Sequence, residues 1–363
     1  MQNYDLNIFA YICKCDILLM AFATIVLLIL CRNAMIQKRH ISILALKNAN
    51  YASIVDARSV FRKVNEILSA QGKRELFEIQ IIGESPEVVI EDGMVAITVD
   101  RLSDEIGKTD LIIIPALRGD MLSAGHYNRF FVDWIIRQYK RNAEVASLCT
   151  GAFMLAFTGL LKNKKCTTHW QYANEFRFFY PDVTLVDGRI IVEQNGLYSS
   201  GGSNAYWNLL IFLVEKYVSR EMAILVAKYF VVDLDKIAQT PFIVFNGLKE
   251  HDDKKVLQAQ EFIEQHYFQK ITVESLTKKL FLTRRTFERR FKKCTTCSPI
   301  EYLQKVRIEA SKKALEAGRK SVDEIMTDVG YFDSQTFREL FKKITGLTPV
   351  AYRDRYQKQV ETA

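Results

Sequence analysis

The sequence predicts an α/β doubly wound sheet domain followed by an all-α domain that contains two copies of one helical unit. The first half alternates short apolar runs with amphipathic stretches, which is typical of a mostly parallel sheet covered by helices. The second half contains "TFERRFKKCTTCSPIEY" at 286–302 and nearly repeats it as "TFRELFKKITGLTPVAY" at 336–352. A chain of 363 residues, 49% of them hydrophobic, is long enough for two cores and too apolar for extended disorder.

The first 34 residues precede this pattern and contain a hydrophobic stretch at 17–31, "ILLMAFATIVLLILC". As a helix it would span about 22 Å, which is short of the ~30 Å hydrocarbon layer. Its flanks lack the positive region of a signal peptide. Three interpretations stay open: a dispensable upstream extension, a membrane anchor, or a core element. We expect a cytoplasmic protein, with an inner-membrane tether through residues 17–31 as the alternative.

Charge and cysteine usage narrow the class of protein. Most of the net charge of +8 falls after His251, in the part that carries the repeat. A basic surface confined to one domain suggests a polyanionic partner. The seven cysteines form no even framework, which favours a reducing compartment with free thiols over a disulfide scaffold.

The first domain is predicted to begin with a strand and to alternate strands and helices. The expected strands are 40–46, 77–83, 110–117 and 144–149. One helix between them would bury Val60, Val64, Ile67 and Leu68, and another would bury Phe130, Trp134, Ile135 and Tyr139. Ligands of such sheets bind at the carboxyl ends of the strands.

One strand end carries "SLCTGAF" at 147–153, the layout of a nucleophile elbow. Cys149 ends the strand, and Gly151 opens a helix whose amino terminus would favour the thiolate. His169, in "CTTHW", is expected in a neighbouring strand-end loop, and Gly119 ends another strand in "PALRGD".

Two longer stretches, "CTGAFMLAFTGLLKNKKCTTHW" and "GLYSSGGSNAYWNLLIFLVE", resemble the class I glutamine-amidotransferase-like fold of the intracellular-protease type. More narrowly, residues 40–217 resemble the sensor half of AraC/XylS regulators with this flavodoxin-like fold. The resemblance implies a small-molecule pocket. Its expected lining is Gly119, Cys149, His169, Gly201 and Gly202.

The resemblance departs from the catalytic members, in which His often follows the elbow Cys and an acid follows the first strand. Here Thr150 follows Cys149, and "KNANYAS" at 47–53 contains no acid. A thiol without a neighbouring base or acid lacks the groups that would activate it as a nucleophile. We therefore expect a catalytically silent domain in which Cys149 lines the pocket. A sensing thiol remains open, as does a thiol-dependent hydrolase or hydratase that uses Cys149 with His169 as base.

Between the domains we place a connector at 221–252, after a sensor domain at 36–220 and before the repeat domain at 253–358. It starts as a helix, and "NGLKEHDDKK" at 246–255 is polar and contains Gly. Ile224, Leu225, Ala227 and Tyr229 offer a helical face for a dimer contact.

Each copy of the repeat reads as a helix-turn-helix unit. Thr272 and Thr283 are the expected N-caps of the first unit, and Ser321 caps the second. Between the units, Ser298, Pro299 and Gly318 mark the ends of one helix of about 28 Å. Successive major-groove faces of B-DNA are about 34 Å apart. The repeat therefore predicts a chain that places two helices in consecutive grooves.

This part resembles the AraC/XylS DNA-binding domain over residues 255–356, on "FERRFKK", "SPIEYLQKVRIEASKKAL" and "SVDEIMTDVGYFDSQTFRELFKKITGLTPVAYR". Thr296 stands where the second unit has Gly346, a position that suits a left-handed turn. Phe287, Phe291, Phe337 and Phe341 are expected in the core.

Side chains on the outward faces are expected to contact double-stranded DNA. Base contacts are predicted for Arg285, Glu288, Arg289, Ser334, Gln335, Arg338 and Glu339. Phosphate contacts are predicted for Arg290, Lys292, Lys293, Lys342 and Lys343.

The resemblance implies a bacterial transcription regulator that acts on two adjacent half-sites, responds to a small molecule, forms a homodimer and contacts RNA polymerase. Cys294 and Cys297 form an isolated C-x-x-C without a second pair. We therefore expect incidental loop cysteines, no metal and no cofactor, with a zinc site or a redox pair as the alternatives.

Overall fold

The computed structural model describes residues 38–90, 93–235, 238–249 and 251–357. The hydrophobic stretch at 17–31 lies outside these residues. Among the described residues, no helix has both the length and the apolar character that a membrane crossing requires.

A seven-stranded sheet with the order β10-β11-β7-β6-β1-β2-β5 forms the centre of the first domain. Its strands are β1 Arg39–Leu44, β2 Phe77–Gly83, β5 Arg101–Leu102, β6 Leu111–Ile114, β7 Glu144–Ser147, β10 Ile191–Gln194 and β11 Leu197–Ser200. All pairs are parallel except β10 with β11. Two small sheets join β3 Glu87–Ile90 to β4 Val95–Thr98, and β8 Lys165–Cys166 to β9 Thr184–Leu185. The predicted α/β doubly wound class is confirmed.

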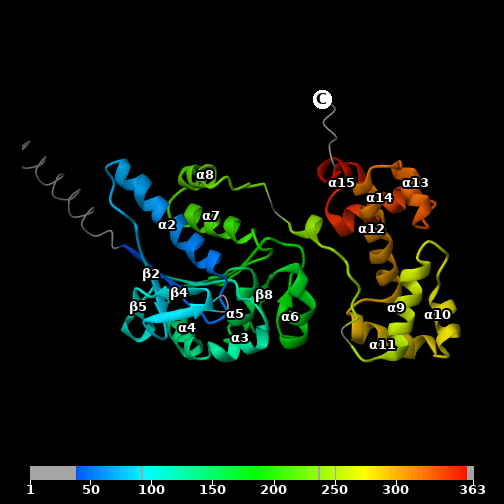
Figure 1. The fold of residues 1–363 in the computed structure, drawn as a ribbon, viewed down its shortest axis with the longest axis horizontal. Helices are drawn as coiled ribbons and strands as arrows, with labels where there is room; N and C mark the ends of the chain where they lie inside the picture. The colour runs from blue at the N-terminus through cyan, green and yellow to red at the C-terminus, as the bar shows by residue number, and fades with distance from the viewer. Residues whose placement is uncertain (1–37, 91–92, 236–237, 250, 358–363) are drawn as a thin grey trace, which may run out of the picture.

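Helices cover both faces of this sheet (Figure 1). On one side lie α2 Tyr51–Ala70, α7 Tyr206–Tyr217 and α8 Arg220–Tyr229. On the other side lie α3 Met121–Tyr127, α4 Phe130–Lys140 and α5 Ala152–Phe157, with α6 Ala173–Phe179 beside β8. Short 3-10 helices are η2 Ser103–Glu105, η3 Cys149–Gly151, η4 Trp170–Tyr172 and η5 Thr240–Phe242.

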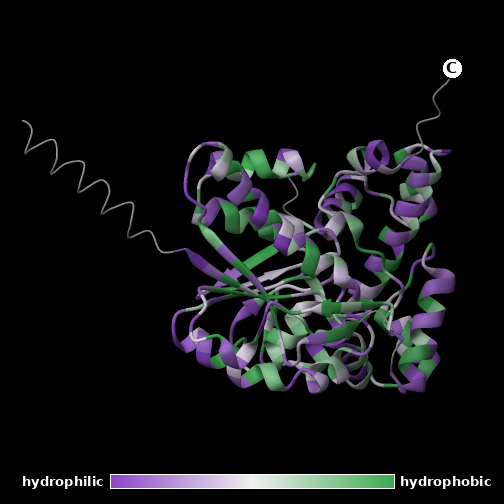
Figure 2. Cartoon of the chain, turned by 60° about the vertical axis from the view of Figure 1, so that its left-hand side comes forward, coloured by the Kyte–Doolittle hydropathy of each residue, from purple (hydrophilic) through white to green (hydrophobic). Residues whose placement is uncertain are grey.

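The central strands are apolar because helices bury them on both faces, and Figure 2 shows them as the hydrophobic interior of the domain. Ile112, Ile113 and Ile114 of β6 are fully buried. One expectation was wrong by a residue: Phe131 rather than Phe130 enters the core, and Phe130 is exposed. The difference arises because Phe131, Trp134, Ile135 and Gln138 share the buried face of α4, whereas Phe130, the first residue of the helix, lies to the side of it.

Helix α8 belongs to the same hydrophobic cluster as the sheet, through Met222, Ala223, Val226 and Ala227. The chain then runs through η5 toward the second domain (Figure 1).

The second domain is all helical. Its helices are α9 Lys254–His266, α10 Val273–Leu280, α11 Arg284–Thr295, α12 Pro299–Ala317, α13 Val322–Asp328, α14 Ser334–Thr345 and α15 Pro349–Tyr356. The predicted caps are confirmed. Thr272 and Thr283 accept backbone hydrogen bonds, and Ser298 and Ser321 form capping boxes with Glu301 and Glu324.

The ends of the repeated helices also agree with the sequence. Thr296 adopts φ +59° at the end of α11, and Gly346 adopts φ +78° at the end of α14. Phe287, Phe291, Phe337 and Phe341 are fully buried, as predicted. Helix α12 therefore links two helix-turn-helix units, α10–α11 and α13–α14, which Figure 1 places toward its two ends.

Candidate functional site

Cys149 lies at the carboxyl end of β7, where the chain turns sharply into η3 and α5. Its backbone adopts φ +54°, an uncommon conformation for a residue with a Cβ. Its N–H donates to Ser200 Oγ at 3.0 Å, and Thr168 Oγ1 donates to its carbonyl at 3.2 Å. Gly151 is required because a Cβ there would lie 2.4 Å from Pro115 O. The ends of β7 and β11 and the loop after β8 therefore meet at this residue.

The Cys149 thiol is buried, with 4% of the residue exposed. Burial raises the pKa of Cys149 to about 11, and the hydrogen bonds from Thr150 only partly oppose this. The helix amino terminus does favour the thiolate, as expected, through the Thr150 N–H, but the desolvation of the buried thiol outweighs this effect. The thiol is therefore protonated at neutral pH.

His169 caps η4, and its Nδ1 accepts a hydrogen bond from the Gln171 N–H at 3.1 Å. Burial lowers the pKa of His169, so its ring is neutral at pH 7. Among the described residues, no hydrogen bond joins this ring to the Cys149 thiol. The two groups that a thiol mechanism would need are not paired.

Gln239, in the connector, fills the space beside Gly201. Its Nε2 donates to Thr168 O at 2.9 Å and to Arg189 O at 3.3 Å, while its Oε1 accepts from Trp170 N–H at 3.2 Å. Gln239 is 3% exposed. The connector thus reaches the loop that carries His169.

A carboxylate that the sequence analysis did not anticipate also lies near the elbow. Tyr206, the first residue of α7, donates through its hydroxyl to Asp56 Oδ2 at 2.6 Å. Burial raises the pKa of Asp56, against the effect of this hydrogen bond. The pKa of Tyr206 is raised, mainly by burial. The hydrogen bond to Asp56, the charge of Asp56 and the nearby Cys149 raise it further.

Gly119 follows the β6 strand end, two residues beyond Leu117, whose N–H donates to Thr150 Oγ1 at 2.8 Å. Gly119 adopts φ +73°, and a Cβ there would meet open space. Gly202 adopts φ +63° directly after Gly201. Each of the five predicted pocket residues thus follows the end of a strand. Cys149 contacts Ser200, beside Gly201, and Thr168, beside His169, whereas its neighbour Thr150 contacts the loop that carries Gly119.

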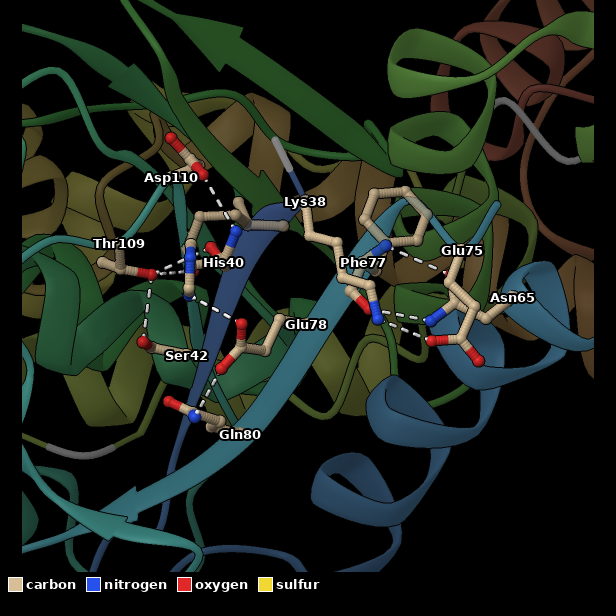
Figure 3. A network of polar contacts seen from close by, with 11 residues as sticks. Lys38, His40, Ser42, Asn65, Glu75, Phe77, Glu78, Gln80, Thr109 and Asp110 are labelled. Carbon is tan, nitrogen blue, oxygen red and sulfur yellow. Dashed lines mark hydrogen bonds and ion pairs between the residues drawn. The ribbon is translucent and has the colours of Figure 1, made fainter. Parts of the chain in front are cut away.

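A cavity of about 690 Å³ lies elsewhere, at the amino ends of β1 and β2. Figure 3 shows its polar network, in which His40 Nδ1 lies 3.5 Å from Glu78 Oε2 and Ser42 Oγ donates to Thr109 Oγ1 at 3.0 Å. The His40 N–H donates to Asp110 Oδ2 at 2.9 Å. These polar groups satisfy one another, so the network supports the strand ends.

The second candidate site is the outward face of α11 and α14. Exposed side chains on these helices include all of the following predicted DNA contacts: Arg285, Arg289, Lys292, Lys293, Gln335, Arg338, Glu339, Lys342 and Lys343. Glu288 and Ser334 are half-buried.

Several of these side chains are paired within the protein. Arg284 Nε donates to Glu288 Oε1 at 3.0 Å, and Gln335 Nε2 donates to Glu339 Oε1 at 2.9 Å. Arg290 makes a bidentate contact with Asp253, at 2.8 and 2.7 Å, and so secures the N-cap of α9. This pairing occupies the guanidinium for which a phosphate contact was predicted.

Comparison with known proteins matches both parts of the chain. Residues 46–216 match the DJ-1/PfpI family, and residues 276–355 match a helix-turn-helix domain. The chain therefore joins a DJ-1/PfpI-type domain to an AraC-type helix-turn-helix domain.

Among the relatives is the HTH-type transcriptional regulator GbdR of Pseudomonas aeruginosa, 24% identical over 88% of this chain and 84% of that protein. The regulator CdhR of the same species is 20% identical over 76% of this chain and 81% of that protein. Solved structures with this similarity include Drosophila melanogaster DJ-1beta, 18% identical with a TM-score of 0.46, covering 54% of this chain and 100% of that chain. An AraC family transcriptional regulator from Pseudomonas putida is 17% identical with a TM-score of 0.45, and the match covers 53% of this chain and 100% of that chain.

The DJ-1/PfpI domain therefore holds the elbow, and the AraC-type domain holds the exposed basic helices. The sequence pattern does not indicate Asp56, because the acid of the catalytic members follows the first strand, at 47–53 here, whereas Asp56 lies further along α2. It does not indicate Gln239 either, because nothing in "KIAQTPF" indicates a long-range contact. Within the described part of the chain, no group of three or more His, Cys, Asp or Glu side chains is placed to hold a metal ion.

Proposed function

We propose that the protein is a sequence-specific DNA-binding transcription regulator whose DJ-1/PfpI domain binds a small molecule without transforming it. The observation that carries the proposal is the second domain, where α12 holds two helix-turn-helix units, each with an exposed basic helix. Two such units separated by a helix of about 28 Å suit consecutive major-groove faces.

In this proposal the reading helices have divided roles. Arg285, Glu288 and Arg289 of α11, and Ser334, Gln335, Arg338 and Glu339 of α14, contact base edges. Arginine suits guanine, glutamine suits adenine and glutamate accepts from cytosine. Lys292, Lys293, Lys342 and Lys343 contact phosphates, which position the domain without specifying sequence.

The proposed ligand site lies where the segments that follow β6, β7 and β11 meet. Asn50 Oδ1, at the start of α2, is a buried acceptor without a partner among the described atoms, and a ligand donor would satisfy it. Two observations support a site without catalysis. The pKa of Cys149 is raised, and His169 Nδ1 accepts a hydrogen bond from the Gln171 N–H. The relatives named above are regulators, which agrees with that role.

Coupling between the two domains is proposed to run through the connector. Gln239 holds the Thr168–Trp170 loop, and the next residues contact the AraC-type domain. Tyr356 donates through its hydroxyl to Pro241 O at 3.3 Å, and Phe245 N–H donates to Glu309 Oε2 at 3.1 Å. A ligand that moved the Thr168–Trp170 loop would therefore bias the position of the second helix-turn-helix unit, by its differential affinity for the two states.

The proposed division is a sensor at 36–220, a connector at 221–252 and a reader at 253–358. The first helix of this connector, α8, packs against the core of the sensor. We place the protein in the cytoplasm, as a homodimer that contacts RNA polymerase. The outward side of α8 supports the dimer, because Leu225 and Tyr229, one helical turn apart, are 46% and 60% exposed. Ala227, expected on the same face, is instead buried in the core.

Selection of bound duplexes from a random pool by the purified full chain tests the proposal. Enrichment of two half-sites about one helical turn apart is the expected result. Binding that is sensitive to salt and indifferent to sequence would overturn the reader assignment. In that case, thiol-dependent turnover that disappears in Cys149→Ser would support an enzyme with a basic appendage.

A further inference from the structure

The two helix-turn-helix units have separate hydrophobic cores. One is centred on Phe287 and Phe291, and the other on Phe337 and Phe341. Tyr267, directly after α9, packs against both cores. The loop that begins at this residue is thus the place where the first unit meets the second.

Arg307, in the middle of α12, fixes this loop from one side. Its Nε donates to Tyr267 O at 2.8 Å, and its Nη2 donates to Gln269 O at 2.8 Å. The rigid fork of a guanidinium holds two carbonyl oxygens in one geometry, which an ammonium group cannot do. The same guanidinium lies 5.0 Å from the ring centroid of Tyr331, in the turn of the second unit.

Gly330 approaches the loop from the second unit. A Cβ at Gly330 would lie 2.7 Å from Phe268 O and 2.9 Å from Arg307 Nη2. Gly330 also adopts φ +85°, a backbone conformation that other residues rarely adopt. Arg307, the Tyr267–Gln269 loop and the Gly330–Tyr331 turn therefore form one contact that joins both units.

A fixed contact between the units has a consequence for DNA recognition. Adding one base pair between two half-sites moves the second half-site by about 3.4 Å and rotates it by about 35° around the duplex. A rigid pair of units can satisfy only one separation, whereas a loosely joined pair can follow several.

We propose that Arg307 is a positioning residue that fixes the spacing between the two half-sites, by clamping the Tyr267–Gln269 loop of the first unit against the Gly330–Tyr331 turn of the second. The proposal rests on the proposed function, since it requires that both units bind DNA. It concerns spacing and not the base preference of either unit, because Arg307 lies on neither α11 nor α14.

The test uses the full chain and duplexes that carry both selected half-sites, with the spacer varied one base pair at a time. Wild-type protein should favour one spacer over its neighbours. In Arg307→Gln the preference should fall by roughly three- to tenfold, as the loss of one or two hydrogen bonds allows. The affinity for an isolated half-site should stay unchanged. Lys313→Gln is the matched control, because it removes one positive charge from an exposed position on α12 and should keep the wild-type spacing profile.

Gly330→Ala perturbs the same contact from the other unit and should flatten the profile as well. If Arg307→Gln does not fold, Arg307→Lys keeps the charge without the fork and takes its place. A weaker but equally selective profile in these variants would overturn the proposal, since Arg307 would then only stabilise the first unit. Absence of any paired half-site preference in the wild-type protein would instead overturn the proposed function.

Discussion

Gln239 and Gly201 lie in direct contact, so close that a Cβ at Gly201 would stand 2.3 Å from Gln239 Nε2. The contact joins the connector to the strand end beside Cys149, and it leaves no room for a larger residue at Gly201. Gln239 is therefore the described side chain through which a change at the proposed pocket reaches the connector most directly.

Replacing Gln239 by Ala should destabilise the DJ-1/PfpI domain. The change leaves Thr168 O and Trp170 N–H without their side-chain partner and removes one of two donors to Arg189 O, which costs about 2 kcal/mol of unfolding free energy. Urea unfolding measures the loss, and hydrogen exchange at the Trp170 amide should become faster. Gln171→Ala removes the same side chain from an exposed position and should change neither. Equal effects of both variants would contradict the role assigned to Gln239.

Two of the proposed base-reading residues, Arg289 and Gln335, can be tested without disturbing the fold, because both are exposed. Arg289→Ala and Gln335→Ala should each lower the affinity for the selected site by about 1–3 kcal/mol and relax the preference at one base position. Fluorescence anisotropy with selected and scrambled duplexes measures both effects. Unchanged sequence preference would show that other side chains read the bases.

Lys343→Ala tests the contrasting case of a proposed phosphate contact. It should weaken binding to all duplexes alike and reduce the slope of log affinity against log salt by about one. A salt titration of the wild-type protein and the variant measures this slope. An effect confined to the selected sequence would instead assign Lys343 to base recognition.

Cys149 should react slowly with iodoacetamide. With a pKa of about 11, roughly one molecule in a thousand carries the thiolate at pH 8, and the thiolate is the nucleophile. Among the four cysteines that the structure describes, mass spectrometry should find Cys294, which is the least buried, alkylated before Cys149. Cys149→Ser should keep DNA binding. Rapid and selective alkylation of Cys149 would favour the sensing-thiol or enzyme interpretation.

Asp56 should make stability depend on pH. Its pKa is raised in the folded state, chiefly by burial, so the folded protein holds the proton more tightly than the unfolded chain. That contribution is fully present below the ordinary Asp pKa of about 3.9 and is lost as the pH rises through the folded value. Asp56→Asn should therefore remove part of the decline in stability above pH 4. The effect should stay below about 1 kcal/mol, because the carboxyl is partly exposed and solvent screens it.

Urea unfolding between pH 4 and pH 7 measures this difference. Asp104→Asn, at an exposed position, is the control and should leave the pH profile as it is. Identical profiles for wild type and Asp56→Asn would show that Asp56 titrates alike in both states.

The sequence by itself determined the elements whose causes are local. Thr272, Thr283, Ser298 and Ser321 mark helix starts because each cap bonds a backbone N–H within three residues, so the pattern is readable along the chain. The repeat of buried phenylalanines fixed the two helix-turn-helix units for the same reason. Buried apolar runs likewise indicated the strands and so the class of the sheet.

Only the tertiary structure decided the contacts between distant segments. Asp56 and Tyr206 are 150 residues apart, Gln239 and Thr168 are 71 apart, and Arg307 and Tyr267 are 40 apart. The protonation of Cys149 was likewise decided by burial, which outweighs the helix terminus that the local sequence shows. Burial and long-range pairing depend on how elements pack, and no local pattern of residues encodes that packing.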